Sequence, residues 1–318
     1  MNHPVRFAYQ ITSSYDDDVI AAARRAEQLG FDVCVMADHV GPDRRAPLTT
    51  LAAVAASTRS IRLGTLVLNS DMRNPVQLAW EVSNLDHLSG GRMELGLGAG
   101  HTPQEYAATG IEMEAPAERK AAMIEMARLM RHLLDGDKVS VDGRRHTLTS
   151  AQVPRSVQER LPIMVAGNGS NVLQAAGAIA DTVGLSGLGR TLEDGHRHEV
   201  RFAPDRVDAQ VADIVTGAAS AGRPPPEINA LVQIAKVTDD PEAELAPVIE
   251  RLGTTSFDEL MTTPYVLVGT VDEIVAKIKR CNSRWGITYF ALRALDEFAP
   301  VIESFARPVT WAKPILGS

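Results

Sequence analysis

Short apolar segments alternate along the whole chain with longer segments in which apolar positions repeat every three or four residues. The short segments are rich in β-branched residues and have the length of strands, whereas the longer segments have the period of amphipathic helices. The pattern predicts eight strands, at 5–10, 33–37, 62–68, 93–99, 162–166, 182–185, 228–237 and 288–293.

The helices expected between these strands begin and end at residues that typically terminate helices. Asp16, Asp17 and Asp18 place negative charge where a helix start has unpaired N–H groups. Asn74-Pro75 supplies a cap followed by a proline at the first helical position. The expected helices cover 16–29, 47–60, 75–88, 117–134, 170–180, 205–221, 271–285 and 295–305.

The order of these elements predicts the fold class. Strands separated by helices run parallel, and eight such units are enough to close a barrel. An open doubly wound sheet would show the same alternation, but the number of strands and the chain length favour closure. We therefore predict an α/β protein whose residues 1–318 form a single domain, a (β/α)8 TIM barrel.

Three longer segments interrupt the alternation as insertions, at about 135–161, 186–204 and 238–264. The first contains the pattern of a β-hairpin around Asp142-Gly143. The other two follow the sixth and seventh strands. We expect them to cover the strand C-terminal face, where the active sites of TIM barrels lie.

Composition and charge exclude several kinds of partner. The net charge is −8 and only 5% of the residues are aromatic, which disfavours a nucleic-acid partner. No signal-peptide pattern and no apolar stretch of roughly 18 residues is present, so no membrane partner is expected. Cys34 and Cys281 show no Cys-x-x-Cys spacing and suit a reducing compartment. We expect a cytoplasmic protein that acts on a small-molecule substrate.

Asp38 and His39 follow the second predicted strand and therefore face the predicted mouth of the barrel. Histidine exchanges protons near neutral pH, and a neighbouring carboxylate can orient it. The alternative is that Asp38 caps a loop while His39 is a rim residue, and the sequence leaves both interpretations open. The segment His196-Arg197-His198 is expected to be a solvated patch, and no metal ligands are expected.

Glycines follow three other predicted strands. Gly98 and Gly100 precede His101 after the fourth strand, and such glycines let a flat ring or another backbone approach closely. Gly167-Asn168-Gly169 follows the fifth strand and Ser186-Gly187 the sixth. Their spacing does not fit a dinucleotide fingerprint. Their backbone N–H groups offer an anion site, although tight strand-to-helix turns explain them equally well.

Taken together, these segments resemble the luciferase-like monooxygenase superfamily, and within it the branch of deazaflavin-dependent oxidoreductases. The resemblance covers nearly the whole chain. It is most specific in the continuous stretch that includes 62–68, 73–76, 85–92 and 94–100, with further matches at 23–38 and 267–274.

The resemblance implies which residues form the site. It implies a flavin or deazaflavin ring at the barrel mouth and a non-proline cis peptide at Leu66–Val67 against the face of that ring. His39 would transfer the proton, and Asp38 would contact the ring edge or orient His39. The glycines at 98 and 100 would border the ring.

The cofactor's phosphate-bearing tail is implied to lie against the loops that follow the fifth and sixth strands. The residues concerned are Gly167, Asn168 and Gly169, together with Ser186 and Gly187. The chain departs from deazaflavin-dependent sugar-phosphate dehydrogenases at two positions. They carry a glutamate where His101 stands and an asparagine where Gln104 stands. His101 would then serve as a different acid or shape the pocket.

The function expected from this resemblance is hydride transfer between coenzyme F420, a deazaflavin, and an unidentified small organic substrate. His39 is the expected acid/base, and His101 is a candidate to assist it. One alternative is a monooxygenase dependent on flavin mononucleotide (FMN). A second alternative is a cofactor-free, non-catalytic barrel subunit. A homodimer is expected from the resemblance alone.

Overall fold

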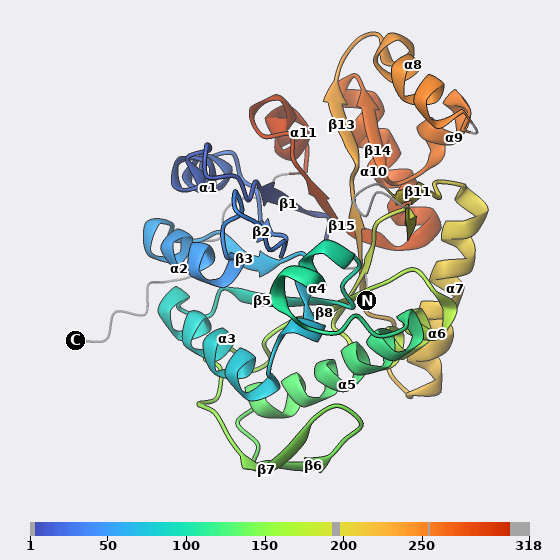
Figure 1. The fold of residues 1–318 in the computed structure, drawn as a ribbon. Helices are drawn as coiled ribbons and strands as arrows, with labels where there is room; N and C mark the ends of the chain where they lie inside the picture. Colours follow the sequence, from blue (N-terminus) through green and yellow to red (C-terminus); the bar gives the residue numbers. More distant parts are fainter. Residues whose placement is uncertain (1–3, 193–197, 254, 306–318) are drawn as a thin grey trace.

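The computed structural model describes residues 4–192, 198–253 and 255–305, and its centre is a closed barrel of eight parallel strands (Figure 1). Each strand pairs with its sequence neighbours, and pairing of the first strand with the last closes the ring. The predicted TIM barrel is confirmed. Its strands are β1 (Arg6–Ile11), β2 (Val33–Met36), β3 (Arg62–Thr65), β5 (Met93–Gly98), β8 (Ile163–Ala166), β9 (Thr182–Leu185), β12 (Glu227–Leu231) and β15 (Ile287–Leu292).

Helices surround the strands (Figure 1). Asp18 caps the first of them by accepting hydrogen bonds from two backbone N–H groups, and Asn74 does the same for the third. Thr270 and Glu273 form a capping box at the start of α10. The surrounding helices are α1 (Val19–Gln28), α2 (Pro47–Ser57), α3 (Pro75–Ser89), α5 (Pro116–Leu134), α6 (Ser170–Ile179), α7 (Pro204–Ser220), α10 (Val271–Trp285) and α11 (Ala299–Glu303).

Two predicted strands are divided in the structure. The strand expected at 62–68 is β3 followed by the short β4 (Leu68–Asn69), because a cis peptide at Leu66–Val67 interrupts the extended chain. The strand expected at 228–237 is β12 followed by β13 (Ile234–Val237), which leaves the barrel and pairs with β14 (Val266–Gly269). Neither run contains a proline, and apolar residues continue on both sides of each break, so periodicity alone could not locate the breaks.

The insertions lie in three places (Figure 1). The predicted hairpin is present as β6 (Val139–Asp142) and β7 (Thr147–Ala151), and its turn donates backbone hydrogen bonds to Glu125 of α5. After β9, the antiparallel pair β10 (Leu188–Thr191) and β11 (His198–Val200) extends from the mouth. Beyond β13 lie α8 (Pro241–Leu252) and α9 (Phe257–Thr262).

Three shorter helices complete the described structure. Residues expected to be a loop after β5 form α4 (Pro103–Thr109). The two 3-10 turns are η1 (Ser70–Met72) and η2 (Asp296–Phe298). Among the described residues, no helix has both the length and the apolar character needed to cross a bilayer.

Side chains alternate between two cores. On β15, Phe290 and Leu292 pack outward against the helices, whereas Tyr289 and Ala291 face the barrel interior. On the neighbouring β1, Phe7 points outward and Ala8 inward. This alternation is what a strand requires, and it determines which residues beyond each strand face the mouth.

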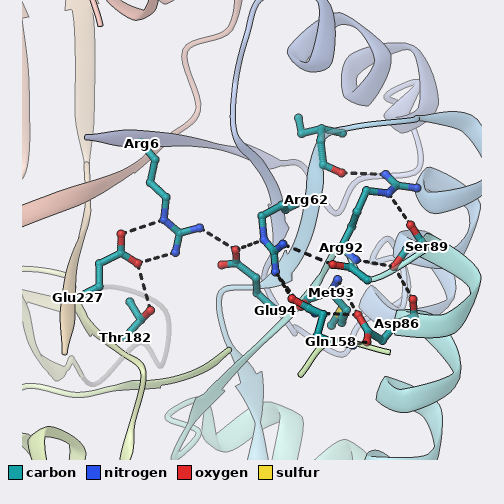
Figure 2. A network of polar contacts seen from close by, with 12 residues as sticks. Arg6, Arg62, Asp86, Ser89, Arg92, Met93, Glu94, Gln158, Thr182 and Glu227 are labelled. Atoms are coloured by element: carbon teal, nitrogen blue, oxygen red, sulfur yellow. Dashed lines mark hydrogen bonds and ion pairs between the residues drawn. The ribbon is translucent and has the colours of Figure 1, made fainter. Parts of the chain in front are cut away.

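A buried polar network fills the strand N-terminal end of the barrel (Figure 2). Arg6 of β1 donates two hydrogen bonds to Glu227 of β12, at 2.9 and 2.6 Å, and a third to Glu94 of β5 at 2.7 Å. Arg62 of β3 reaches the same Glu94 carboxylate. Four strands are therefore cross-linked at the end opposite the predicted site.

Replacement of Glu94 by Gln tests this network. Burial acts to raise the pKa of the Glu94 carboxyl. Arg6 and Arg62 together lower this pKa by more than burial raises it, so the group stays ionised. Loss of its charge leaves two guanidiniums without their shared partner. We expect the free energy of unfolding to fall by about 3 kcal/mol in urea denaturation. The exposed Glu81→Gln is the control and should change it by less than about 0.5 kcal/mol; equal effects would contradict the assignment.

Candidate active site

All residues that the sequence singles out as site candidates follow barrel strands, and the closed ring brings them to one end of the molecule. His39 follows β2, the Leu66–Val67 peptide follows β3, and His101 follows β5. The glycine turn at 167–169 follows β8 on the other side of β5. The imidazole at position 39 and the glycine turn therefore border the same mouth.

The contact that orients His39 comes from a residue that the sequence did not indicate. Glu105, in α4, lies with its carboxylate oxygen Oε1 2.7 Å from Nδ1 of His39. The His39 side chain is 39% exposed and that of Glu105 is 11% exposed. A carboxylate bound to one ring nitrogen of a histidine fixes the ring and leaves the other nitrogen available. A weak signal was present, since Pro103 at a helix start places an acid in the first turn.

Asp38 has a different role from the one expected beside His39. One oxygen of its carboxylate accepts a hydrogen bond from the backbone N–H of Asn69 at 3.1 Å and one from Arg73 at 2.8 Å. These contacts tie the end of β2 to β4 and the following turn. The carboxylate that contacts His39 is that of Glu105, and contact of Asp38 with the ring edge stays a prediction.

His101 lies between two other histidine rings. Its ring centroid is 5.6 Å from that of His39 and 4.7 Å from that of His198 in β11. Burial, followed by the neighbouring His198 and His39, lowers the pKa of His101 to about 4. At neutral pH the ring is therefore uncharged, so it can donate one hydrogen bond and accept another but is not a cationic acid.

The predicted solvated patch at 196–198 is only partly described. His196 and Arg197 lie outside the described residues, while His198 is half-buried beside His101, and its Nδ1 is buried without a hydrogen-bond partner in the described residues. Among these residues, no group of three or more His, Cys, Asp or Glu side chains is arranged to hold a metal ion.

The cis peptide expected at Leu66–Val67 is present in the structure. Leu66 is buried in the barrel interior, and Val67, only partly buried, packs beside it. A Cβ at Gly98 would lie 2.5 Å from Cγ2 of Val67, so glycine is required there for close packing of the two strands. Gly100 lies against Tyr106 and Asn69. The groups that approach these two glycines in the described structure are protein side chains, and the approach of a flat ring stays a prediction.

The loops after β8 and β9 are joined by Asn168. Its side-chain amide donates to the Leu188 carbonyl at 2.7 Å and to the Ser186 hydroxyl at 3.4 Å. Gly187 has a φ of +66° and lies against the Tyr265 ring, so a side chain there would be both strained and blocked. The amide of Asn168 thus holds the two loops together.

A positive charge lies beside the second glycine of this turn, where a Cβ would meet no clash. Gly167 packs against α6, but a Cβ at Gly169 would have Nζ of Lys120 as its nearest neighbour, 3.8 Å away. Gly169 is the N-cap of α6 and supplies no side-chain cap. Arg206, at the start of α7, donates to the Asn168 carbonyl at 3.5 Å. Uncapped N–H groups beside a cation suit an anion.

The fold and this site define a class: a (β/α)8 barrel with a carboxylate-bound histidine beside a cis-peptide bulge at its mouth. Residues 5–253 match the sequence model of the luciferase-like monooxygenase family, and the chain belongs to that family.

Two relatives and one solved structure illustrate the similarity. The chain is 30% identical to an F420-dependent glucose-6-phosphate dehydrogenase of Nocardia farcinica (strain IFM 10152), over 90% of this chain and 85% of that protein. It is 32% identical to a 5,10-methylenetetrahydromethanopterin reductase of Methanolobus tindarius, over 65% and 57%. In fold it resembles an F420-dependent secondary alcohol dehydrogenase solved with an F420-acetone adduct, with a TM-score of 0.76, 20% identity and coverage of 94% and 97%.

The low pKa of His101 can be measured directly. In an NMR titration of the histidine rings, we expect the signal that disappears in His101→Asn to have a midpoint near 4. A midpoint near the ordinary 6.5 would contradict the influence of the neighbouring His198 and His39 rings. Because the unfolded chain binds this proton at higher pH, the free energy of unfolding should fall as the pH drops from about 6.5 to about 4. His101→Asn should lose less stability over this pH range.

Proposed function

We propose that the protein is an oxidoreductase that transfers a hydride between coenzyme F420 and a small organic substrate, with His39 as the acid/base residue. The observation that carries the proposal is the His39–Glu105 contact at the mouth, beside the Leu66–Val67 bulge. The F420-dependent relatives support the choice of cofactor.

The residues at the mouth fit such a cofactor in shape and charge. Leu66 and Val67 offer an apolar surface to a flat ring, with Gly98 and Gly100 beside it. Asp38, held by Arg73, lies next to this surface and would contact the ring edge. Apolar walls with a few placed polar groups are typical of cofactor sites.

The phosphate-bearing tail would lie against the second pair of loops. Gly169 and the uncapped start of α6 offer backbone N–H groups, and Lys120 and Arg206 offer positive charge. Gly167 and Gly187 shape the turns, while Asn168 and Ser186 hold the two loops in register. We assign the tail to the outer side of these loops, beside Gly169 and Lys120.

The chain's own residues supply proton transfer and positioning. Bound F420 supplies a ring carbon that accepts or donates the hydride. Glu105 accepts a hydrogen bond from Nδ1–H of His39, which leaves Nε2 to take a proton from a substrate hydroxyl or return it to a carbonyl oxygen. His101, uncharged at neutral pH, would hold the same substrate oxygen by a hydrogen bond.

Cofactor titration tests the proposal. Purified full-length protein is titrated with F420 and with FMN, and the two dissociation constants are compared by fluorescence quenching. We expect F420 to bind more tightly than FMN, because the relatives of this chain are F420-dependent. The turn at Gly169 also presents no side chain in front of Lys120. Tighter binding of FMN would favour the flavin monooxygenase alternative, and binding of neither would favour the non-catalytic barrel.

Substitutions at His39 and Glu105 test the roles of these residues. His39→Asn should lower kcat by roughly 100- to 10,000-fold while the dissociation constant of F420 stays unchanged. Glu105→Gln keeps a hydrogen-bond acceptor but loses its charge, and we expect kcat to fall on the order of 10-fold with KM unaffected.

His132→Asn is the matched control, since this exposed histidine pairs with Asp137 at the far end of α5. It should leave kcat unchanged. A normal kcat in His39→Asn would refute the acid/base role, and a Glu105→Gln effect on KM alone would refute positioning through His39.

A further inference from the structure

One guanidinium at the barrel mouth has no role in the site described so far. Arg293 directly follows β15, whose neighbours in the ring are β1 and β12. Within the described residues it makes no hydrogen bond or ion pair, and it is exposed. An arginine keeps its charge under all ordinary conditions.

The alternation of β15 indicates the direction of this side chain. Tyr289 and Ala291 face the barrel interior and Phe290 and Leu292 face the helices. β15 ends at Leu292, and continuing its alternation by one residue would turn Arg293 inward. The inward residue below it is an alanine, and on β1 the paired position is Ala8. On these two strands the layer below Arg293 and Gln10 therefore consists of alanines.

Among the residues that the structure describes, no carboxylate neutralises this charge. Asp296 pairs with Arg25 at 2.6 Å, and Glu297 pairs with Lys236 at 2.9 Å. Burial alone lowers the pKa of Arg293, with no contribution from a neighbouring charge. The guanidinium therefore has no counter-ion among the described residues.

A second unpaired polar group lies on the adjacent strand. Tyr9 of β1 pairs with Leu292 of β15, so Gln10 and Arg293 are the next residues on neighbouring strands. Gln10 is only 7% exposed, and its amide oxygen is buried without a partner among the described residues. A buried amide without a partner costs free energy, which a polar ligand would recover.

We propose that Arg293 and Gln10 form a subsite for an anionic group of the substrate, a carboxylate or a phosphate. The inference rests on the proposed function, because it assigns the substrate class of the same barrel mouth. The substrates would be small alcohols or carbonyl compounds that carry a negative charge. Arg293 binds the anion, and the amide oxygen of Gln10 accepts a hydrogen bond from a hydroxyl group of the same molecule.

The test measures anion binding without the cofactor. Lactate and inorganic phosphate are titrated separately against the full chain by ligand-observed NMR, for the wild type, Arg293→Gln, Arg293→Lys and Arg59→Gln. Arg59 is an exposed arginine just before β3, at the strand N-terminal end of the barrel. Arg59→Gln therefore removes the same charge from the end opposite the mouth. Lys120→Gln identifies any binding at the start of α6.

We expect Arg293→Gln to weaken binding of at least one probe by about 10-fold or more, Arg293→Lys to retain most of it, and Arg59→Gln to change nothing. Loss for lactate alone assigns a carboxylate substrate, and loss for phosphate assigns a phosphate ester. The subsite is refuted if the wild type binds neither probe, if Arg293→Gln binds both normally, or if only Lys120→Gln abolishes binding.

Parallel F420 titrations separate this inference from the proposed function. Arg293→Gln should keep the wild-type dissociation constant for F420; a weaker one would assign Arg293 to the cofactor and refute the substrate subsite. If the wild type binds no F420 but its anion binding depends on Arg293, the proposed function fails while the anion subsite stands.

Discussion

Parallel pairing of β1 with β15 is the constraint on which the rest of the structure depends. It joins the first and last strands of the ring, so that segments separated by more than 250 residues in sequence follow neighbouring strands at one mouth. Without closure, Gln10 and Arg293 would lie at opposite edges of a sheet. The shared mouth lets loops from five strands contribute to one site.

The polar groups at the two ends of the barrel differ in how they are hydrogen-bonded. At the strand N-terminal end, Arg6, Arg62, Glu94 and Glu227 satisfy one another in a closed network (Figure 2). At the mouth, the amide oxygen of Gln10 and the guanidinium of Arg293 have no partner within the part of the chain that the structure describes. Buried polar groups that pair internally stabilise a fold, whereas those left unpaired at a concave end indicate a ligand.

The sequence predicted most of the barrel, because each buried strand is a short apolar run between helices with clear caps. It failed where an apolar run contains a change of direction: nothing in 228–237 indicates that the chain leaves the ring after Leu231. Candidate residues that follow strands directly were also found, including His39 and His101. Glu105 was missed because its contact with His39 joins residues 66 positions apart, and only the folded position of α4 brings them together.

A crystal structure of the protein with F420 tests the central claim most directly. The account predicts the deazaflavin ring against the Leu66–Val67 peptide, His39 within hydrogen-bonding reach of a substrate oxygen placed at the ring's reactive carbon, and the phosphate at the start of α6 beside Lys120. A ring bound elsewhere on the molecule, or bound in the mouth with His39 turned away from it, would contradict the account.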